Sequence, residues 1–243
     1  MADAVQGGTL AGSHEGKPGL PRGRSRLPAR AVLASQRERL LRAAVAAVAG
    51  SDYATVTVAD IVRQAKVSRA AFYAHFTGKE DCFLEATHQG GQLMASRVLA
   101  AARAAAAEAP DEDVLRAGCR AFLRFLADEP AFARAFYIDM PAAGPVAVER
   151  LYAASERFAR INRAWHDRAR VRHPEWPSVP FDACLGLAGA TAELVRCRVR
   201  ADRTNTLPDL EDTLVSLHLA VLTGQPWGTH RAHRNDTKDA SVS

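Results

Sequence analysis

The positively charged side chains are the groups whose placement along this sequence points most directly to a chemistry. The 243 residues include 32 Lys or Arg and 27 Asp or Glu, for a net charge of +5. Residues 1–34 hold five basic and two acidic side chains, residues 35–81 hold seven and five, and residues 82–243 hold twenty of each. The whole surplus lies in the first third, as expected if that third binds a polyanion. A chance excess on a solvated surface is the alternative that the charges alone do not exclude.

The sequence contains no pattern typical of catalysis. It has no Gly-rich phosphate loop, no Gly-x-Ser-x-Gly and no His-Glu-x-x-His. Several titratable residues lie close together in the sequence, but their spacing is not typical of a catalytic site. They are Glu149, Glu156, His166, Asp167, His173 and Glu175. We therefore expect a protein that is not an enzyme, with no catalytic residue and no cofactor.

The four cysteines, Cys82, Cys119, Cys184 and Cys197, form no Cys-x-x-Cys or other short metal-binding spacing. We expect reduced, partly buried thiols and no metal site, as in a cytoplasmic protein. No window approaches the roughly 18 uninterrupted apolar residues of a membrane span, and the first 16 residues lack the pattern of a secretory signal. Membrane association is not expected.

The chain divides into a polar beginning, a long helical stretch and a polar end. Residues 1–34 are rich in Gly, Pro, Ser and Arg, which predicts a flexible basic arm, and residues 225–243 predict a polar tail. No segment shows the strict alternation of a strand, so the fold class is all-α. The expected helices span about 35–49, 57–65, 68–76, 78–107, 111–128, 130–139, 145–172, 180–203 and 208–223.

Two short, capped helices separated by a tight turn are predicted between residues 57 and 76. Thr57 and Asp60 have the spacing of a capping box, and Ser68 is a suitable cap for the second helix. Phe72 and Phe76 lie one turn apart on the inner face of that second helix and are expected in the core. Such a unit is a helix-turn-helix, which places its second helix in the major groove of DNA. Thr77-Gly78-Lys79-Glu80 then predicts a further capping box at the start of a long helix.

Residues 35–83, SQRERLLRAAVAAVAGSDYATVTVADIVRQAKVSRAAFYAHFTGKEDCF, resemble the DNA-binding domain of the TetR family of bacterial regulators. The resemblance implies a homodimer with a nine-helix fold. It implies a DNA-binding domain over residues 35–82 and an effector-binding and dimerisation domain over residues 83–224. One departure is Lys66, where the family usually has Gly in the turn. A left-handed Lys costs about 1 kcal/mol more than Gly, so a different or slightly strained turn is expected.

The resemblance assigns roles to individual positions. Ser68, Arg69, Ala70 and Ala71 match positions that face base edges, where Arg69 would bind guanine through two hydrogen bonds. Thr57, Tyr73, His75 and Lys79 match positions that contact the phosphate backbone. The alternatives are a half-buried aromatic side chain for Tyr73 and a solvated imidazole for His75. Arg24 and Arg26, with Arg22 and Arg30, would enter the minor groove or form a solvated basic tail.

Large apolar side chains are concentrated between residues 115 and 165. A stripe of this kind is core by default, but in this family the corresponding helices surround a mostly apolar effector cavity. The candidate pocket residues are Phe122, Phe125, Phe136, Met140, Tyr152, Phe158 and Trp165. Residues 141–145 are expected to form a loop near the pocket mouth.

The last two long helices are the candidate dimer interface. Small residues on the first would allow close approach of helices, and apolar residues recur on the second at helical spacing. The candidate interface residues are Gly186, Gly189, Ala190, Leu210, Leu214, Leu217 and Val221. His218 is expected to be an interface or surface group rather than a metal ligand.

Gly90 and Gly91 interrupt the predicted helix over 78–107. Each interior Gly costs a helix about 1 kcal/mol relative to Ala, so the pair could act as a hinge between the two domains. Close packing of a neighbouring helix is the alternative explanation.

Together these features predict a ligand-responsive regulator that binds a near-palindromic double-stranded DNA site as a homodimer. It would be a repressor released by a small, lipophilic effector. The alternative is a helical small-molecule carrier or enzyme in which the helix-turn-helix pattern is accidental.

Overall fold

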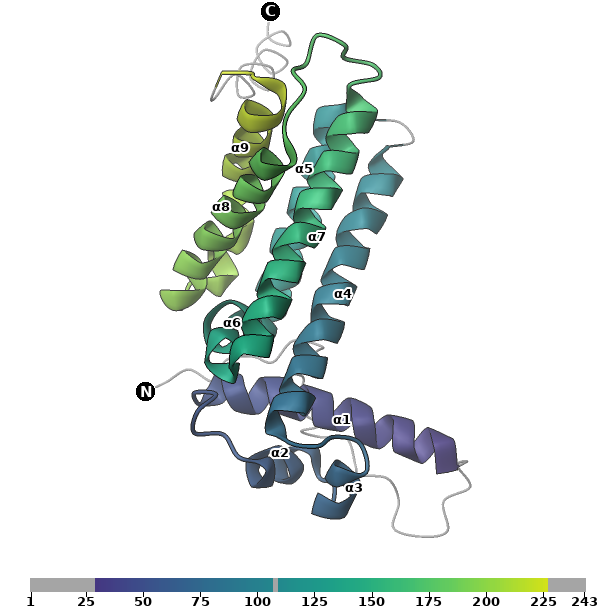
Figure 1. The fold of residues 1–243 in the computed structure, drawn as a ribbon, viewed down its shortest axis with the longest axis vertical. Helices are drawn as coiled ribbons and strands as arrows, with labels where there is room; N and C mark the ends of the chain where they lie inside the picture. Colours follow the sequence, from purple (N-terminus) through teal and green to yellow (C-terminus); the bar gives the residue numbers. More distant parts are fainter. Residues whose placement is uncertain (1–28, 107–108, 227–243) are drawn as a thin grey trace, which may run out of the picture.

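The computed structural model describes residues 29–106 and 109–226, and within them it contains helices and no strand. The long helices form an upright bundle, and three N-terminal helices lie across its lower end (Figure 1). The predicted arm residues Arg22, Arg24 and Arg26 and most of the predicted tail lie outside the described residues. The helices are α1 Ala29–Gly50, α2 Val58–Ala65, α3 Arg69–Tyr73, α4 Lys79–Ala105, α5 Asp111–Asp128, α6 Pro130–Arg134, η1 Ala135–Asp139, η2 Met140–Ala143, α7 Pro145–Ala169, α8 Phe181–Arg200, η3 Thr204–Leu210 and α9 Glu211–Thr223.

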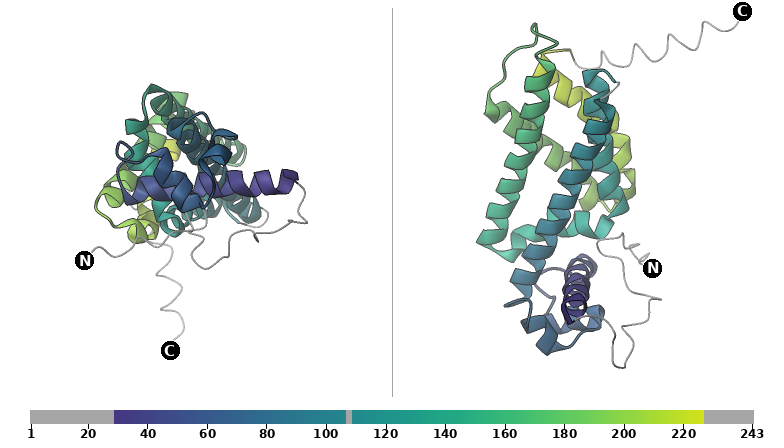
Figure 2. Two further views of the ribbon diagram at one scale, coloured as in Figure 1. Left: turned by 90° about the horizontal axis from the view of Figure 1, so that it is seen from below. Right: turned by 90° about the vertical axis from the view of Figure 1, so that its right-hand side faces the viewer.

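Helix α1 begins at Ala29, six residues before the predicted start. The prediction of an arm over residues 1–34 is therefore wrong for residues 29–34. No Pro or Gly falls between Pro28 and Gly50, and the residues in this stretch are mostly Ala, Arg and Leu, which favour helix. Leu40, Ala44 and Val48 recur every four residues on the buried face of α1. Seen nearly end-on in the right-hand view of Figure 2, α1 lies under the bundle and against α4.

The two helices of the predicted helix-turn-helix are present. At α2 the Thr57 Oγ1 accepts the Asp60 N–H at 3.3 Å, and Asp60 Oδ2 accepts the Thr57 N–H at 3.0 Å, which confirms the capping box. Hydrogen bonds to the Asp60 carboxylate from the Thr57 hydroxyl, the Thr57 N–H and Arg63 lower the pKa of Asp60 to about 2. Lys66 ends α2 with a φ of 53° and a ψ of 44°. Of the two expected turns, the structure thus has the slightly strained one, with a left-handed Lys66 whose carbonyl accepts a hydrogen bond from Arg39 at 3.4 Å.

Helix α3 is shorter than predicted, since it ends at Tyr73. The chain continues from there as a tight turn in which both the His75 and the Phe76 N–H groups bond to the Phe72 carbonyl at 2.9 Å. Phe72 and Phe76 are buried as predicted, with ring centroids 5.7 Å apart.

The predicted capping box at Thr77 is wrong. Gly78 occupies the N-cap position of α4 and has no side chain to accept a hydrogen bond. Asp81 bonds backward instead, and its Oδ2 accepts the Thr77 N–H at 2.9 Å and the Thr77 hydroxyl at 3.1 Å. A carboxylate in the first turn also complements the helix dipole.

Helix α4 runs from the N-terminal helices into the bundle without interruption, so the predicted domain boundary at residues 82 and 83 falls inside a helix (Figure 1). Its middle packs on Phe132 from α6. A Cβ placed on Gly90 would lie 2.2 Å from Phe132 Cε2, whereas a Cβ on Gly91 would lie 3.9 Å from Phe136. The geometry at Gly90 supports the packing explanation for this glycine pair.

The segment from α6 to η2 departs from a regular helix. The predicted helix over 130–139 is α-helical only to Arg134 and continues as a π-helix over Ala135–Asp139. The predicted loop over 141–145 overlaps a 3₁₀ turn, Met140–Ala143, which leads to Gly144 at a φ of 100° and to α7. π-Helical turns are rare and occur frequently at functional sites.

This segment lies against the N-terminal helices. Arg134 lies 3.8 Å from Asp52, in the loop after α1, and 3.8 Å from Asp139 in η1. The Asp139 side chain is buried, and burial raises its pKa to about 6 despite the neighbouring Arg134.

Helices α7, α8 and α9 complete the bundle, and α7 and α8 end three residues before their predicted ends. The start of the last predicted helix is a 3₁₀ helix that surrounds Pro208, and α9 begins at Glu211. Arg116 and Arg120 of α5 both bond to Glu211 and so fix α9 to α5.

Across the described ranges, no helix is long and apolar enough to cross a membrane. The four cysteines are free thiols; Cys82, Cys119 and Cys184 are buried and Cys197 is exposed.

The Gly90→Ala and Gly91→Ala variants should differ in stability. Phe132 is held between Phe125 and Phe136, so its ring cannot yield to a Cβ at position 90. We expect Gly90→Ala to lower the free energy of unfolding by about 1–3 kcal/mol. Gly91→Ala should leave it unchanged or raise it by up to about 1 kcal/mol. Urea unfolding measures both, and equal effects of the two substitutions would contradict the packing explanation.

Asp139→Asn should stabilise the protein at neutral pH and not in acid. A carboxyl group whose pKa is raised from 3.8 to about 6 binds its proton more tightly in the folded state, so its stability cost appears as the pH rises between those values. The variant should gain about 3 kcal/mol over the wild type above pH 6 and nothing below about pH 4. Unfolding curves at both pH values test this, and a pH-independent difference would show that the buried charge is not the cause.

Candidate functional site

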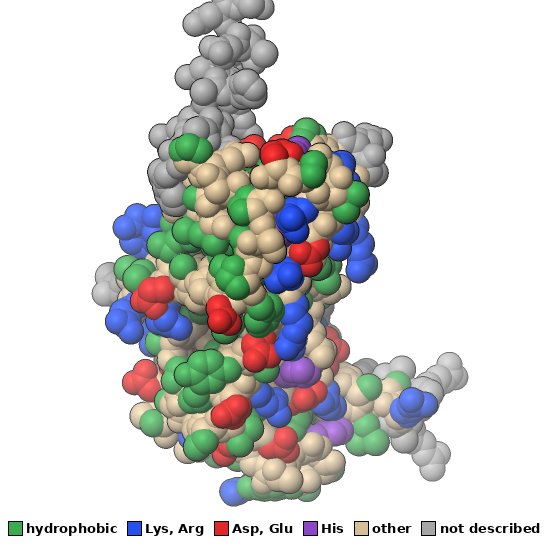
Figure 3. Space-filling model, turned by 45° about the horizontal axis from the view of Figure 1, so that its top comes forward, with side chains coloured by type: hydrophobic (Ala, Val, Ile, Leu, Met, Phe, Trp, Pro, Cys, Tyr) green, Lys and Arg blue, Asp and Glu red, His purple; other side chains and the backbone are tan. Residues whose placement is uncertain are grey.

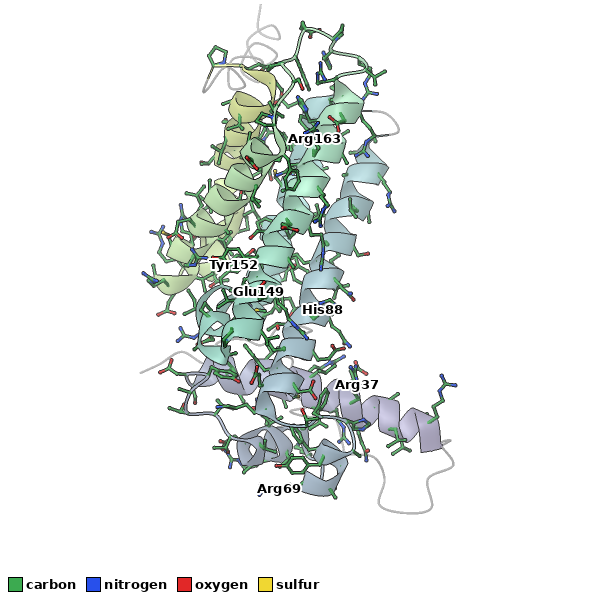
Figure 4. All side chains as sticks on the ribbon, viewed as in Figure 1. Arg37, Arg69, His88, Glu149, Tyr152 and Arg163 are labelled. Atoms are coloured by element: carbon green, nitrogen blue, oxygen red, sulfur yellow. The ribbon has the colours of Figure 1, made fainter. Side chains whose placement is uncertain are left out.

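The exposed face of α3 carries the residues predicted to contact DNA bases. Ser68 caps the helix, with its Oγ accepting the Ala71 N–H at 3.1 Å. Phe72 faces the core, which leaves Arg69 and Ala70 exposed and Ala71 half-buried. Figure 4 shows Arg69 at the lower end of the molecule, directed away from the bundle. A short helix with one anchored and one open face can enter a groove.

Arg69 and Tyr73 lie together on this open face. The Arg69 guanidinium carbon lies 5.7 Å from the Tyr73 ring centroid, and its Nη2 lies 3.4 Å from the Tyr73 hydroxyl. Tyr73 is half exposed. The tyrosine therefore orders the arginine while leaving its other donors open to a ligand.

Lys79 is directed toward the loop between α1 and α2. Its Nζ donates to the carbonyls of Tyr53 and Val56, both at 2.8 Å, and lies 3.4 Å from the Ala54 carbonyl. The same atom lies 4.5 Å from the Tyr53 ring centroid. The expected phosphate contact of Lys79 does not fit this geometry, because the loop carbonyls already accept its hydrogen bonds.

The other two predicted backbone contacts have different surroundings. Thr57 is exposed but uses its hydroxyl in the cap of α2, where it donates to Asp60 at 2.6 Å. His75 is half-buried beside Phe76. It is therefore not the solvated imidazole that was the alternative to a contact with the DNA backbone. Sequence reasoning did not single out Arg63, whose side chain is 75% exposed on α2.

A cavity of about 150 Å³ lies inside the bundle, between α4, α5, η1, α7, α8 and α9. Four of the seven predicted pocket residues line it, namely Phe122, Phe136, Phe158 and Trp165. The prediction is wrong for the other three. Phe125 and Met140 are buried in the core away from the cavity, and Tyr152 is 65% exposed on the outer side of α7 (Figure 4).

The cavity wall also contains polar side chains that sequence reasoning missed. They are Ser155 and Asn162 from α7, Thr191 and Arg196 from α8, and His218 from α9. His218 was expected at an interface or on the surface, but it is buried within the protomer. Its spacing of four residues from Leu214, which also lines the cavity, was the available signal.

Helices α8 and α9 leave one face uncovered within the protomer. Gly186, Gly189 and Ala190 are exposed, and apart from the adjacent backbone of α8 nothing lies within 4 Å of a Cβ built on either glycine. Val221 is also exposed and Leu217 is half-buried. Hydrophobic side chains lie along the left-hand side of the molecule in Figure 3, the side of these helices in Figure 1.

Two of the predicted interface residues do not belong to that face. Leu210 and Leu214 are buried within the protomer, because α9 also packs on α5 and η3. In the part of the chain that the structure describes, no group of His, Cys, Asp and Glu could hold a metal ion.

Solved structures with the same fold cover most of the chain. FadR from Bacillus subtilis, solved in complex with stearoyl-CoA, has a TM-score of 0.64 and 16% identity over 77% of this chain and 98% of its own. FadR from Bacillus halodurans has a TM-score of 0.64 and 18% identity over 78% and 99%. A TetR-family transcriptional regulator from Pectobacterium atrosepticum has a TM-score of 0.59 and 22% identity over 82% and 100%. At these identities the similarity shows the fold, and it confirms the predicted all-α, TetR-like class.

No curated protein matches the chain. Residues 40–86 match the sequence profile described as bacterial regulatory proteins of the tetR family. The matched segment runs from Leu40 in α1 through the helix-turn-helix to the first turns of α4. With the fold, this match confirms the resemblance to the TetR family of transcriptional regulators seen in the sequence.

Proposed function

We propose that this regulator is a repressor that binds a near-palindromic DNA site as a homodimer and releases it when a small apolar effector occupies the internal cavity. The observation that carries the proposal is the open face of α3, where Arg69, Ala70 and Tyr73 are exposed at the end of the molecule. The match of residues 40–86 to a family of bacterial regulatory proteins supports it.

Base recognition falls to Arg69, Ala70 and Ala71. A guanidinium group can donate two hydrogen bonds to guanine O6 and N7, and a methyl group can contact the methyl group of thymine. Tyr73 supports the Arg69 side chain from one side, so less conformational entropy is lost when it binds.

In this proposal Lys79 does not contact DNA but holds another part of the protein in place. Its three carbonyl contacts fix the loop of residues 53–56, which leads directly to the Thr57 cap of α2. The role is therefore to hold α2, and through it α3, in the orientation that DNA binding requires.

Dimerisation is assigned to the uncovered face of α8 and α9. The small residues Gly186, Gly189 and Ala190 would let two copies of α8 approach closely, with Leu217 and Val221 beside them. A two-fold axis through this face would present two α3 helices to successive major grooves, about 34–36 Å apart.

The effector is assigned to the cavity. Its walls include residues of η1 and α4. Both of these helices pack on α1, and α4 follows directly after the helix-turn-helix in the chain. The similar FadR was solved with stearoyl-CoA, and a lipophilic effector for this chain is in keeping with its aromatic wall.

DNA binding should be steeply salt-dependent and two-fold symmetric. Fragments selected from genomic DNA by the full chain should show a symmetric footprint, and log K should fall linearly with log salt concentration. A footprint without two-fold symmetry would contradict the dimer. A flat salt dependence would favour a small-molecule carrier, the alternative function for a helical protein with a cavity.

Arg69→Ala and Lys79→Met should have separable effects. Arg69→Ala removes a base contact and should reduce discrimination at one position of each half-site by about 1–3 kcal/mol without changing stability. Lys79→Met removes charged hydrogen bonds to the loop and should lower the free energy of unfolding by about 1.5–3 kcal/mol. It should weaken binding to every sequence and leave the salt slope unchanged.

Arg160→Ala is the matched control, since Arg160 is an exposed arginine on α7, far from α3 in the chain. Competition binding at several salt concentrations and urea unfolding give the readouts. If Lys79→Met reduced the salt slope by about one unit with unchanged stability, Lys79 would contact phosphate after all.

A further inference from the structure

His218 is the most deeply buried of the ionisable side chains in the cavity wall. It projects from α9, the helix that Arg116 and Arg120 fix to α5, and its residue exposure is 5%. Phe122, Phe158 and Trp165 line the same cavity from α5 and α7. A polar ring thus faces a space whose walls are largely apolar and include several aromatic side chains.

The hydrogen bond of this ring fixes its tautomer. Nδ1 lies 2.7 Å from the Leu214 carbonyl oxygen. A carbonyl only accepts hydrogen bonds, so Nδ1 carries the proton. Burial lowers the pKa of His218 to about 4, and the ring is therefore neutral at pH 7. Nε2 then presents a lone pair, and among the described residues no hydrogen bond to it is found.

The size of the cavity restricts what can occupy it. An apolar cavity of 150 Å³ in another protein holds one benzene molecule, and this cavity has about the same volume. A single ring fits the space, and the surrounding aromatic side chains provide the offset and edge contacts that such rings prefer.

A carboxylate is a poor match for the polar groups of the wall. The lone pair on His218 Nε2 repels an anion, and Arg196 is already engaged. Arg196 Nη1 pairs with Glu193, and its Nε donates to the Tyr137 carbonyl at 3.3 Å. Among the wall residues, the charge of Arg196 is thus already paired, while His218 offers an acceptor and the unpartnered Thr191 hydroxyl offers a neutral polar group.

We propose that the cavity binds a single-ring aromatic molecule of the phenol class, whose hydroxyl group donates a hydrogen bond to Nε2 of His218. The inference deepens the proposed function by naming the chemical class of the effector. Binding itself is a property of the cavity and is measured without DNA.

The probes are p-cresol and p-xylene, which have nearly the same shape and differ by a hydroxyl in place of a methyl group. Their affinities for the full chain are measured by calorimetry and by tryptophan fluorescence, to which Trp165 of the cavity wall contributes, with 4-methylbenzoate as the anionic comparison. We expect wild-type protein to bind p-cresol and to bind 4-methylbenzoate more weakly. In His218→Leu, the affinity for p-cresol relative to p-xylene should fall by roughly tenfold to a hundredfold.

Thr191→Val is the matched control, since it removes another hydrogen-bonding group from the same wall with little change in shape. It should leave the p-cresol to p-xylene ratio unchanged. If His218→Leu does not fold, ¹⁵N NMR of the wild-type chain gives the answer, because p-cresol should shift the His218 Nε2 resonance and p-xylene should not.

Three results would overturn the inference: no binding of p-cresol, tighter binding of 4-methylbenzoate, or a ratio that changes in Thr191→Val and not in His218→Leu. DNA release is scored separately. If p-cresol binds through His218 without releasing DNA, the inference holds and the effector role in the proposed function fails. If p-cresol does not bind while salt-dependent DNA binding is normal, the inference fails and the regulator remains.

Discussion

The ring of Phe132 rests on the backbone of α4 at Gly90, and the arrangement of both halves of the molecule depends on this contact. Only glycine leaves room for the ring, since a Cβ would lie 2.2 Å from it. Phe132 is also in contact with Phe125 and with Phe136, which lines the cavity. Because packed interiors transmit displacements rather than absorb them, a ligand that moves Phe136 acts through one ring on α4. The first turns of α4 bury Phe83 in the core shared with α1 and the helix-turn-helix.

A second connection reaches the same N-terminal helices through the loop after α1. Arg134 lies between Asp139 of the π-helix and Asp52 of this loop. The carbonyls of the following loop residues Tyr53 and Val56 accept hydrogen bonds from Lys79 at the start of α4. The loop that sets the direction of α2 is therefore held from two sides, by α4 and by the segment next to the cavity. Both connections begin at residues that adjoin η1, so both link the cavity wall to the N-terminal helices.

Local signals in the sequence predicted local structure well. The caps at Thr57 and Ser68 each depend on residues within one turn of chain, and both are present. At Lys66 the sequence left open a different or a strained turn, and the structure has the left-handed, strained one. The box at Thr77 failed because Gly78 takes the cap position, which shifts the bonding to Asp81. The contacts of Lys79 reach back 23 to 26 residues, and no spacing rule reveals them.

The cavity was predicted only in part. A run of apolar residues shows which side chains avoid water, but it does not show which of them point into the cavity. Phe158 and Trp165 are seven residues apart and share one face of α7, whereas Tyr152 is six residues before Phe158 and falls on a different face. Helical periodicity could have excluded Tyr152 and placed His218 beside Leu214. The split between buried Leu214 and exposed Val221 on α9 needed the packing of α5, which only the fold supplies.

The central claim is that the cavity and the open face of α3 are energetically coupled, and coupling between two ligands must be reciprocal. The most direct measurement is the affinity for p-cresol with and without saturating DNA, set beside the affinity for the same DNA with and without saturating p-cresol. The account predicts that each ligand weakens the other by the same factor, in the range of about 5 to 150 typical of allosteric proteins. Two ligands that both bind, each with an affinity unchanged by the other, would contradict it.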